Sequence, residues 1–334
     1  ILGFQSGNPK RDGSLREIEV ETTSKDVSLR YRKSYIDRQP LDTLANTREE
    51  KSLRGAMESP GSAKKLPLVF RAIHFYETPR LARVLVSARI DMEKAKFKKK
   101  SGKLSCDLNV MGFAYADNGG VAARFSETVP VTLDIEGNQG LPKTFAYSNY
   151  FRLQPGKYRL KLAVSDGDNN LGATEQESVI PAPRESGVST SSLVIAESVS
   201  HLPALIQNIE ARLLDDNDPL AYAGMQISPS IENVFPVNTP LAVLFKFRDP
   251  AGGLDRWKAS IRAKLVDAAG KERVLAPVSL ESSSSQSRKG EATIACTLRF
   301  RDVEPGPYRL VVEAAGLHPS EAAIAETELK FVAK

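Results

Sequence analysis

The chain has 334 residues, 41% hydrophobic and 26% charged, and these globular proportions exclude wholesale disorder and leave room for two or three domains. Its net charge of +5 is diffuse and only 7% of its residues are aromatic, so no specific nucleic-acid interface is indicated. No apolar run reaches the roughly 18 residues that a membrane span needs, so we expect no transmembrane segment.

Residues 1–36 are predicted to form short strands. ILGF is typical of a buried strand, and Asp12-Gly13 indicates a turn. REIEVET and VSLRYRKSY each alternate apolar and polar residues, which predicts a hairpin across residues 23–26 with one apolar face. Because an isolated hairpin is marginal in water, we expect residues 1–36 to pack against another surface: an upstream domain, the sandwich that follows, or a neighbouring subunit.

The order of these features resembles a known family. The chain is similar here to the end of the von Willebrand factor A (VWFA)-related domain found in many acidobacterial secreted proteins. The similarity rests on four features in order: an LGF strand, a DG turn, the strand around Ile18 and Val20, and the R-x-R-K-x-Y segment from Arg30. The resemblance implies that residues 1–36 are the C-terminal strand and hairpin of such a domain. It also implies an extracytoplasmic protein that is periplasmic, secreted or on the cell surface, as part of the cell envelope.

Two departures limit what this resemblance implies. Ser34 stands where the family usually has Gly. The body of the domain, with any D-x-S-x-S metal-adhesion motif, is missing from this sequence, and residues 12–16 do not match that motif. The resemblance therefore assigns no metal ligand here.

Residues 37–66 are predicted to be a helical connector. Thr47 and Glu50 have the spacing of a capping box, and Leu53, Ala56 and Met57 share one helical face. Pro60-Gly61 ends the helix. We expect the apolar face to pack against a sandwich.

A repeated phrase organises the rest of the chain. LQPGKYRLKLAV begins at Leu153 and VEPGPYRLVVEA begins at Val303, and each joins a Pro-Gly turn to a Tyr and an alternating strand. Such a Tyr often closes a corner before the penultimate strand of an immunoglobulin-like sandwich, so we predict structural corners at Tyr158 and Tyr308, both largely buried. The fold class predicted is mainly β: two tandem immunoglobulin-like β-sandwich domains, preceded by the hairpin remnant and a short helix.

The predicted domain boundaries follow from strand spacing. Residues 67–182 carry seven strands and form the first β-sandwich, residues 183–192 form a disordered linker, and residues 193–334 form the second β-sandwich. Within the second domain, residues 201–223 contain apolar residues at helical spacing. Cys106 and Cys296 fall in different domains, so we expect buried free thiols and no disulfide framework.

A polar segment after the first corner is the best metal candidate. Asp166, Asp168 and Asn170 alternate, and Glu177 follows at a spacing similar to that of an EF-hand loop, so these oxygen atoms could hold calcium. However, Leu171 occupies the position that requires Gly in an EF-hand, and the flanking segments are strands. The alternative is a polar hairpin loop; no other cofactor is indicated.

Residues 94–103 are the strongest charged segment. This stretch contains six lysines: Lys94, Lys96, Lys98, Lys99, Lys100 and Lys103. It could bind a polyanionic glycan, lipid headgroups or nucleic acid by counterion release. The alternative is an exposed, mobile hairpin tip that protects a sheet edge from pairing with other chains.

No catalytic constellation is evident, because the histidines are dispersed and the sequence offers no convergent acid and base groups. We therefore predict a non-enzymatic extracytoplasmic binding, adhesion or scaffolding protein that acts through sandwich surfaces on a protein partner or neighbouring subunit. The alternatives are a carbohydrate-binding accessory module and a structural subunit of a larger cell-envelope assembly. Trp257 could stack on a sugar or anchor a core, and the low aromatic content argues against the carbohydrate module.

Overall fold

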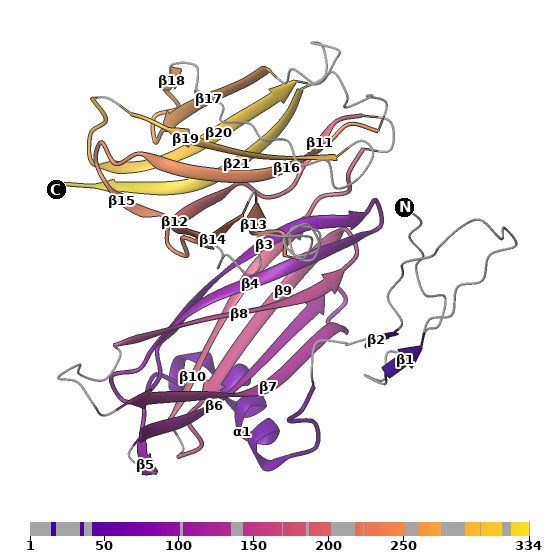
Figure 1. Ribbon diagram of the computed structural model, residues 1–334, viewed down its shortest axis with the longest axis vertical. Helices are drawn as coiled ribbons and strands as arrows, with labels where there is room; N and C mark the ends of the chain where they lie inside the picture. Colours follow the sequence, from indigo (N-terminus) through magenta and orange to yellow (C-terminus); the bar gives the residue numbers. More distant parts are fainter. Residues whose placement is uncertain are drawn as a thin grey trace, which may run out of the picture.

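The computed structural model describes residues 15–17, 34–36, 42–100, 103–134, 143–168, 170–184, 187–201, 218–222, 224–250, 260–274, 291–300, 302–315 and 322–333. These residues are mainly in β-strands, as the sequence predicts, and the described α-helix is α1 (Arg48–Glu58), followed by the 3-10 helix η1 (Pro60–Ser62). The strands form two layered units that lie one above the other in Figure 1.

The first unit packs a three-stranded antiparallel sheet against a five-stranded one. The pairing order is β3-β4-β8 in the smaller sheet and β10-β9-β6 in the larger sheet, where β5 and β7 also pair with β6. The strands are β3 (Leu68–Thr78), β4 (Leu81–Asp91), β5 (Lys98–Lys100), β6 (Lys103–Ala116), β7 (Val121–Asp134), β8 (Thr144–Leu153), β9 (Gly156–Ser165) and β10 (Leu171–Ile180).

Alternating side chains fill the space between these sheets, since successive side chains of a strand point to opposite faces. Val84, Val86 and Ile90 of β4 are buried in one core, in which the rings of Phe125 and Phe151 lie 4.9 Å apart. All seven strands predicted between residues 67 and 182 are present.

The second unit also has two sheets. One has the order β11-β16-β12-β14-β13 with β19 paired to β16, and the other has the order β15-β21-β20-β17-β18. The strands are β11 (Ser189–Thr190), β12 (Val194–His201), β13 (Ala221–Tyr222), β14 (Met225–Pro229), β15 (Val234–Pro236), β16 (Leu241–Arg248), β17 (Ser260–Asp267), β18 (Glu272–Val274), β19 (Glu291–Leu298), β20 (Gly306–Ala315) and β21 (Ala322–Val332). Its core is a separate cluster of buried residues.

The two units share one pairing order. In the first unit β3-β4-β8 faces β6-β9-β10, and in the second unit β12-β16-β19 faces β17-β20-β21. The repeated Pro-Gly-x-Tyr phrase opens β9 in one unit and β20 in the other, which is the penultimate strand each time. The repeat in the sequence therefore marks the same place in two similarly paired units.

Both predicted tyrosine corners form. The Tyr158 hydroxyl donates a hydrogen bond of 2.9 Å to the Gln154 carbonyl, and the Tyr308 hydroxyl donates one of 3.1 Å to the Glu304 carbonyl. The prediction that both side chains are largely buried is wrong, because each ring lies at the rim of its core and is only half-buried.

The segment between the units is more ordered than the sequence suggests. Val188 is buried in the second core, and β11 pairs with β16. The Ser191 hydroxyl accepts a hydrogen bond of 2.8 Å from the Lys246 N–H, and the Ser192 hydroxyl accepts one of 3.0 Å from the His74 N–H. The disordered linker predicted for residues 183–192 is therefore wrong for this part, because its main chain completes sheets of both units.

The two units bury a joint apolar layer. Ile73 and Phe75 of β3 lie in one cluster with Val194 of β12, Tyr222 and Leu244 of β16. At the rim of this layer, the Arg71 guanidinium donates a hydrogen bond of 2.8 Å to the Ile231 carbonyl and one of 3.2 Å to the Thr327 hydroxyl. Leu85 of β4 joins the same layer, so β3, β4 and β16 each fill a core with one face and place single apolar side chains of the other face against the neighbouring unit.

The connector helix covers part of the outer face of β6, β9 and β10. Leu53 and Met57 are buried there against Phe113, as the helical pattern predicts. Thr47 caps the helix by accepting a hydrogen bond of 3.1 Å from the Glu50 N–H, and the Glu50 carboxylate accepts one from the Asn46 N–H.

The start of the chain is described only in part. The short strands β1 (Leu15–Glu17) and β2 (Ser34–Ile36) pair antiparallel, with Leu15 opposite Ile36, as the ends of a hairpin would. The strand predicted at residues 1–4, the predicted turn at residues 23–26 and the apolar helical spacing within residues 202–217 lie outside the described residues. Strands β13, β14 and β15 were not predicted.

Candidate anion-binding site

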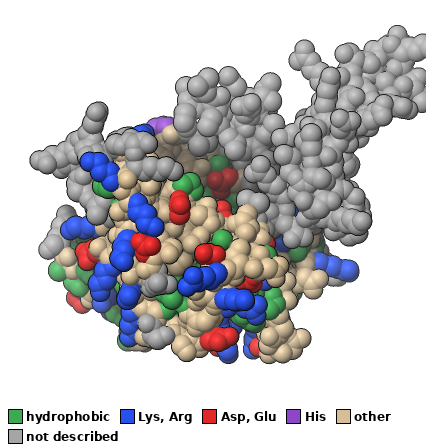
Figure 2. All heavy atoms as spheres, turned by 90° about the horizontal axis from the view of Figure 1, so that it is seen from below, with side chains coloured by type: hydrophobic (Ala, Val, Ile, Leu, Met, Phe, Trp, Pro, Cys, Tyr) green, Lys and Arg blue, Asp and Glu red, His purple; other side chains and the backbone are tan. Residues whose placement is uncertain are grey.

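The lysine-rich tip, residues 94–103, projects from the lower end of the first unit (Figure 1), where β5 turns back into β6. Five lysines of the tip are exposed: Lys94, Lys96, Lys98, Lys99 and Lys103. The Lys100 side chain and residues 101–102 lie outside the described part of the chain. Figure 2 views the molecule from this end and shows Lys and Arg side chains spread over the uncovered surface.

The base of the tip is anchored by apolar contacts. Met92 and Ala95 are buried in the first core, and Phe97 packs against it. The Met92 N–H donates a hydrogen bond of 2.8 Å to the Lys143 carbonyl, which brings another exposed lysine to the same end. The apolar residues thus point inward while the lysines between them point to solvent.

The loop between β9 and β10, which we call the Asp166 loop (residues 166–170), forms hydrogen bonds with the main chain of the tip. Both carboxylate oxygens of Asp166 accept hydrogen bonds: Oδ2 from the Lys96 N–H at 3.0 Å and the Asn170 side-chain amide at 2.6 Å, and Oδ1 from the N–H groups of Asp168 at 2.9 Å and Asn170 at 3.2 Å. The Asn170 side-chain amide also donates a hydrogen bond of 3.1 Å to the Lys94 carbonyl. The loop therefore fixes the main chain of the tip through Lys94 and Lys96 and pairs with one of its ammonium groups, that of Lys98.

The charge of Asp166 is favoured by these contacts. Burial by itself would raise the pKa of Asp166, but the hydrogen bonds from Asn170, Lys96 and Asp168 outweigh it and lower the pKa from its usual value. A buried carboxylate that is ionised and fully hydrogen-bonded holds its partners in one arrangement.

Ion pairing within the described part of the chain involves only some lysines of the tip. Lys98 Nζ lies 3.3 Å from Asp168 Oδ1, an exposed pair of the kind that contributes little to stability. Within the described part of the chain, no ion pair involves Lys94, Lys96 or Lys99. Exposed Lys64 and Lys65 lie close by, because Lys64 pairs with Gly172, just beyond the Asp166 loop. This end therefore carries several exposed lysines, with Asp and Glu side chains interspersed among the basic ones (Figure 2).

The predicted calcium ligands do not come together. Asp166 has its carboxylate oxygens engaged by N–H donors, and Asp168 pairs with Lys98. Glu177 lies along β10 opposite Arg159, about 20 Å of strand beyond Leu171. No group of three or more His, Cys, Asp or Glu suited to a metal occurs among the described residues. The segment is instead the polar hairpin loop that was the alternative interpretation.

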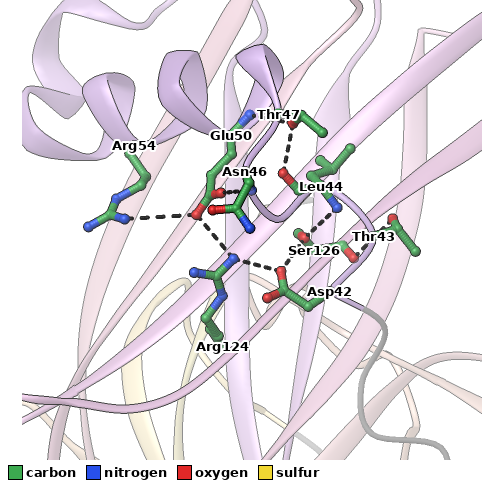
Figure 3. Close-up of polar contacts among 9 residues, drawn as sticks. All are labelled: Asp42, Thr43, Leu44, Asn46, Thr47, Glu50, Arg54, Arg124 and Ser126. Atoms are coloured by element: carbon green, nitrogen blue, oxygen red, sulfur yellow. Dashed lines mark hydrogen bonds and ion pairs between the residues drawn. The ribbon is translucent and has the colours of Figure 1, made fainter. Parts of the chain in front are cut away.

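A second polar cluster, which the sequence analysis did not single out, attaches the connector helix (Figure 3). The Arg124 guanidinium, on β7, donates a hydrogen bond of 2.8 Å to the Asp42 carboxylate and forms an ion pair of 3.0 Å with the Glu50 carboxylate. The Ser126 hydroxyl donates a hydrogen bond of 2.6 Å to the Asp42 carboxylate. Arg124, Asp42 and Glu50 line a pocket of about 450 Å³ with Asn46, Lys51 and Arg54. Arg54 also pairs with Glu50, at 3.8 Å, so two cations balance the two carboxylates and the cluster is a structural attachment.

The fold and this site define a mainly β protein of layered sheets with a basic end. None of its described helices is both long and apolar enough to cross a membrane. No model of a known protein family matches the chain, and a search of curated proteins finds no significant sequence match.

Solved structures with remote similarity include the BSP domain of a biofilm-associated protein, 10% identical over 86% of this chain and 55% of that one, with a TM-score of 0.22. An ICAM-5 ectodomain fragment is 9% identical over 79% of this chain and 69% of that one, with a TM-score of 0.22. A Salmonella alpha-2-macroglobulin mutant is 12% identical over 78% of this chain and 27% of that one, with a TM-score of 0.26. The chain thus spans about half the length of the first of these.

Proposed function

We propose that this protein is a non-enzymatic binding protein of the extracytoplasmic space, in which tandem immunoglobulin-like β-sandwich domains present the lysine-rich tip to a polyanionic glycan. The observation that supports this function is the hydrogen bonding of the Asp166 loop to the tip, which holds its main chain at Lys94 and Lys96 while both of these residues stay exposed. A charged surface that is ordered before binding loses less conformational entropy when its ligand arrives.

The basic residues also favour a polymer over a small anion. The exposed lysines extend from the tip to Lys143 and to Lys64 and Lys65, so a ligand with many negative charges can contact several of them at once. Each contact releases condensed counterions, which makes such binding strong at low salt and weak at high salt.

A neutral sugar platform has less support. The exposed large hydrophobic residues of the described surface are aliphatic and dispersed: Val69, Val121, Val179, Val199, Val234 and Ile324. Flat sugar recognition uses exposed aromatic rings, and Trp257 lies outside the described residues. We therefore favour recognition by charge.

We further propose that each layered unit is an immunoglobulin-like domain and that residues 1–36 are the end of a VWFA-related domain. The shared pairing order and the two tyrosine corners support the first assignment. The antiparallel pairing of Leu15–Glu17 with Ser34–Ile36 agrees with the second. Deleting residues 1–36 should leave both layered units folded, and unfolding of the first unit would place the hairpin within it.

The test of the proposed function uses labelled dextran sulfate as the polyanion and compares two variants of equal net charge. Lys96, Lys98 and Lys99 are changed to Gln in the first variant, and the exposed Lys51, Lys271 and Lys330 are changed to Gln in the second. We expect the first variant to bind about tenfold more weakly at low salt, with a shallower salt dependence, and the second to bind nearly as the natural chain does.

Equal weakening of both variants would show that net charge, and not the tip, attracts the polymer. Binding that does not change between low and high salt would exclude a counterion-release mechanism. Absence of binding to dextran sulfate and to polyglutamate at low salt would reject the function itself.

A further inference from the structure

The Asp166 loop contains a second carboxylate, that of Asp168, which contacts the tip in a different way. Asp166 accepts a hydrogen bond from the main-chain N–H of Lys96, whereas Asp168 Oδ1 lies 3.3 Å from Lys98 Nζ. The first contact involves no ammonium group, and the second pairs directly with one. Asp168 is therefore the residue of this loop whose charge opposes the charge of the tip.

The rest of the loop holds Asp168 close to Lys98. The Asp168 N–H donates a hydrogen bond of 2.9 Å to Asp166 Oδ1, and the Asp166 carboxylate is itself fixed by Lys96 and Asn170. The Asp168 side chain is 33% exposed and the Lys98 side chain is 73% exposed. The carboxylate is thus the sheltered partner of this ion pair, and the ammonium group is the accessible one.

Negative charge also gathers behind the tip. The pKa of the buried Cys106 thiol, on β6, is raised to about 11, first by burial. Three carboxylates raise it too, those of Asp166, Asp107 and Asp168, and the Lys98 ammonium group lowers it. Charges that act on one thiol lie close to one another, because Coulomb interactions weaken with distance. A polyanion that approaches Lys98 therefore meets negative charge directly beside it.

We propose that Asp168 is an internal competitor of the polyanion, which occupies the Lys98 ammonium group in the free protein and has to be displaced before a polymer contacts that lysine. This inference rests on the proposed polyanion function. Displacement breaks the ion pair, and the freed carboxylate then repels the negative groups of the polymer. Within one loop, Asp166 holds the binding segment in place and Asp168 restrains its affinity.

A supporting role for the ion pair is the alternative. In that case Asp168 would hold the Lys98 side chain ready for the polymer, and its removal would weaken binding. The tip does not need this help, because Asp166 and Asn170 already hold its main chain at Lys96 and Lys94. An exposed ion pair also orders its side chains little, since water and salt compete with it.

The test measures binding of labelled dextran sulfate to the full chain and compares three Asp→Asn variants that change the net charge equally. Asp168→Asn removes the competitor. Asp107→Asn removes an exposed carboxylate of β6 that lies near the tip but forms no ion pair with a described residue. Asp117→Asn removes an exposed carboxylate in the turn beyond the far end of β6.

We expect Asp168→Asn to bind about three- to fivefold more tightly than the natural chain at low salt, because both the ion pair and the repulsion are lost. Asp107→Asn should gain less than twofold, and Asp117→Asn should bind as the natural chain does. The gain of Asp168→Asn should shrink as salt is added, since salt screens both effects.

A double-mutant cycle with Lys98→Gln tests whether Asp168 acts through Lys98. In the Lys98→Gln background, Asp168→Asn should change the affinity less than twofold, because the competed ammonium group is gone. An equal gain with and without Lys98 would show that Asp168 only repels the polymer, and this would overturn the competitor assignment.

Unchanged or weaker binding of Asp168→Asn would also overturn it, and equal gains in all three Asp→Asn variants would assign the effect to net charge. Binding by the natural chain without a gain in Asp168→Asn rejects this inference alone. Absence of binding by both chains rejects the polyanion function itself, so the two failures are distinguishable.

Discussion

The Asp166 carboxylate accepts a hydrogen bond of 3.0 Å from the main-chain N–H of Lys96, 70 residues earlier in the chain. One acidic group thereby orders the most basic segment of the protein. It does so through the main chain, so the Lys96 ammonium group remains exposed. The two polar segments that the sequence presents as separate candidates, one for calcium and one for anions, are parts of a single structure.

Asp166→Asn should destabilise the first unit by about 2–3 kcal/mol, because an amide cannot accept all of the N–H donors that surround this carboxylate. The matched control is Asp168→Asn, which removes only the exposed pair with Lys98 and should change the free energy of unfolding by less than about 1 kcal/mol. Denaturant unfolding measures both. Equal effects would mean that the hydrogen bonding of Asp166 is not the stabilising contact.

His74 should make stability depend on pH. Its Nδ1 lies 2.7 Å from the Ser192 hydroxyl, its Nε2 is buried without a described hydrogen-bond partner, and burial lowers the pKa of His74 to about 4. The unfolded chain takes up this proton near pH 6.5, before the folded chain does. Stability is therefore complete above about pH 6.5 and falls by up to roughly 1.4 kcal/mol per pH unit towards pH 4.

Unfolding measured between pH 7 and pH 4 tests the assignment to His74. His74→Gln should remove this contribution to the slope, whereas His201→Gln, at an exposed position, should leave the slope unchanged. An unaltered slope in His74→Gln would assign the pH dependence to other groups.

Two glycine substitutions should have opposite effects. A Cβ at Gly172 would lie 1.7 Å from the Leu66 carbonyl oxygen, so Gly172→Ala must separate β10 from the segment that covers its start, at a cost of more than about 2 kcal/mol. A Cβ at Gly55, in α1, meets nothing within 4 Å. Gly55→Ala should stabilise the chain by up to about 1 kcal/mol, because Ala has the higher helix propensity. Thermal unfolding of both variants checks the signs.

Tyr158→Phe and Tyr308→Phe should each cost about 0.5–1 kcal/mol through the lost hydrogen bond to the Gln154 or Glu304 carbonyl. The cost is at the lower end of the usual range because each ring is half-buried and water can replace the hydroxyl. Comparable shifts of the unfolding midpoint are expected for the two variants. An unchanged midpoint would count against the corners as stabilising elements.

The local elements could be predicted from the sequence. Alternation of apolar and polar residues predicts the seven long strands of the first unit, and the spacing of Thr47 and Glu50 predicts the start of α1. The Pro-Gly-x-Tyr phrase predicts both corners. These features depend on backbone geometry within a few residues, which is encoded by neighbouring side chains.

The relationships between elements were decided only by the tertiary structure. Alternation shows which residues of β3 share a face, but not that Ile73 and Phe75 meet a second unit instead of solvent. Strand spacing did not predict that residues 188–192 are held by both units, or that Glu177 lies far along β10 from Asp166. The contact of Asp166 with Lys96 joins segments 70 residues apart, so it is set by long-range packing that local sequence patterns do not encode.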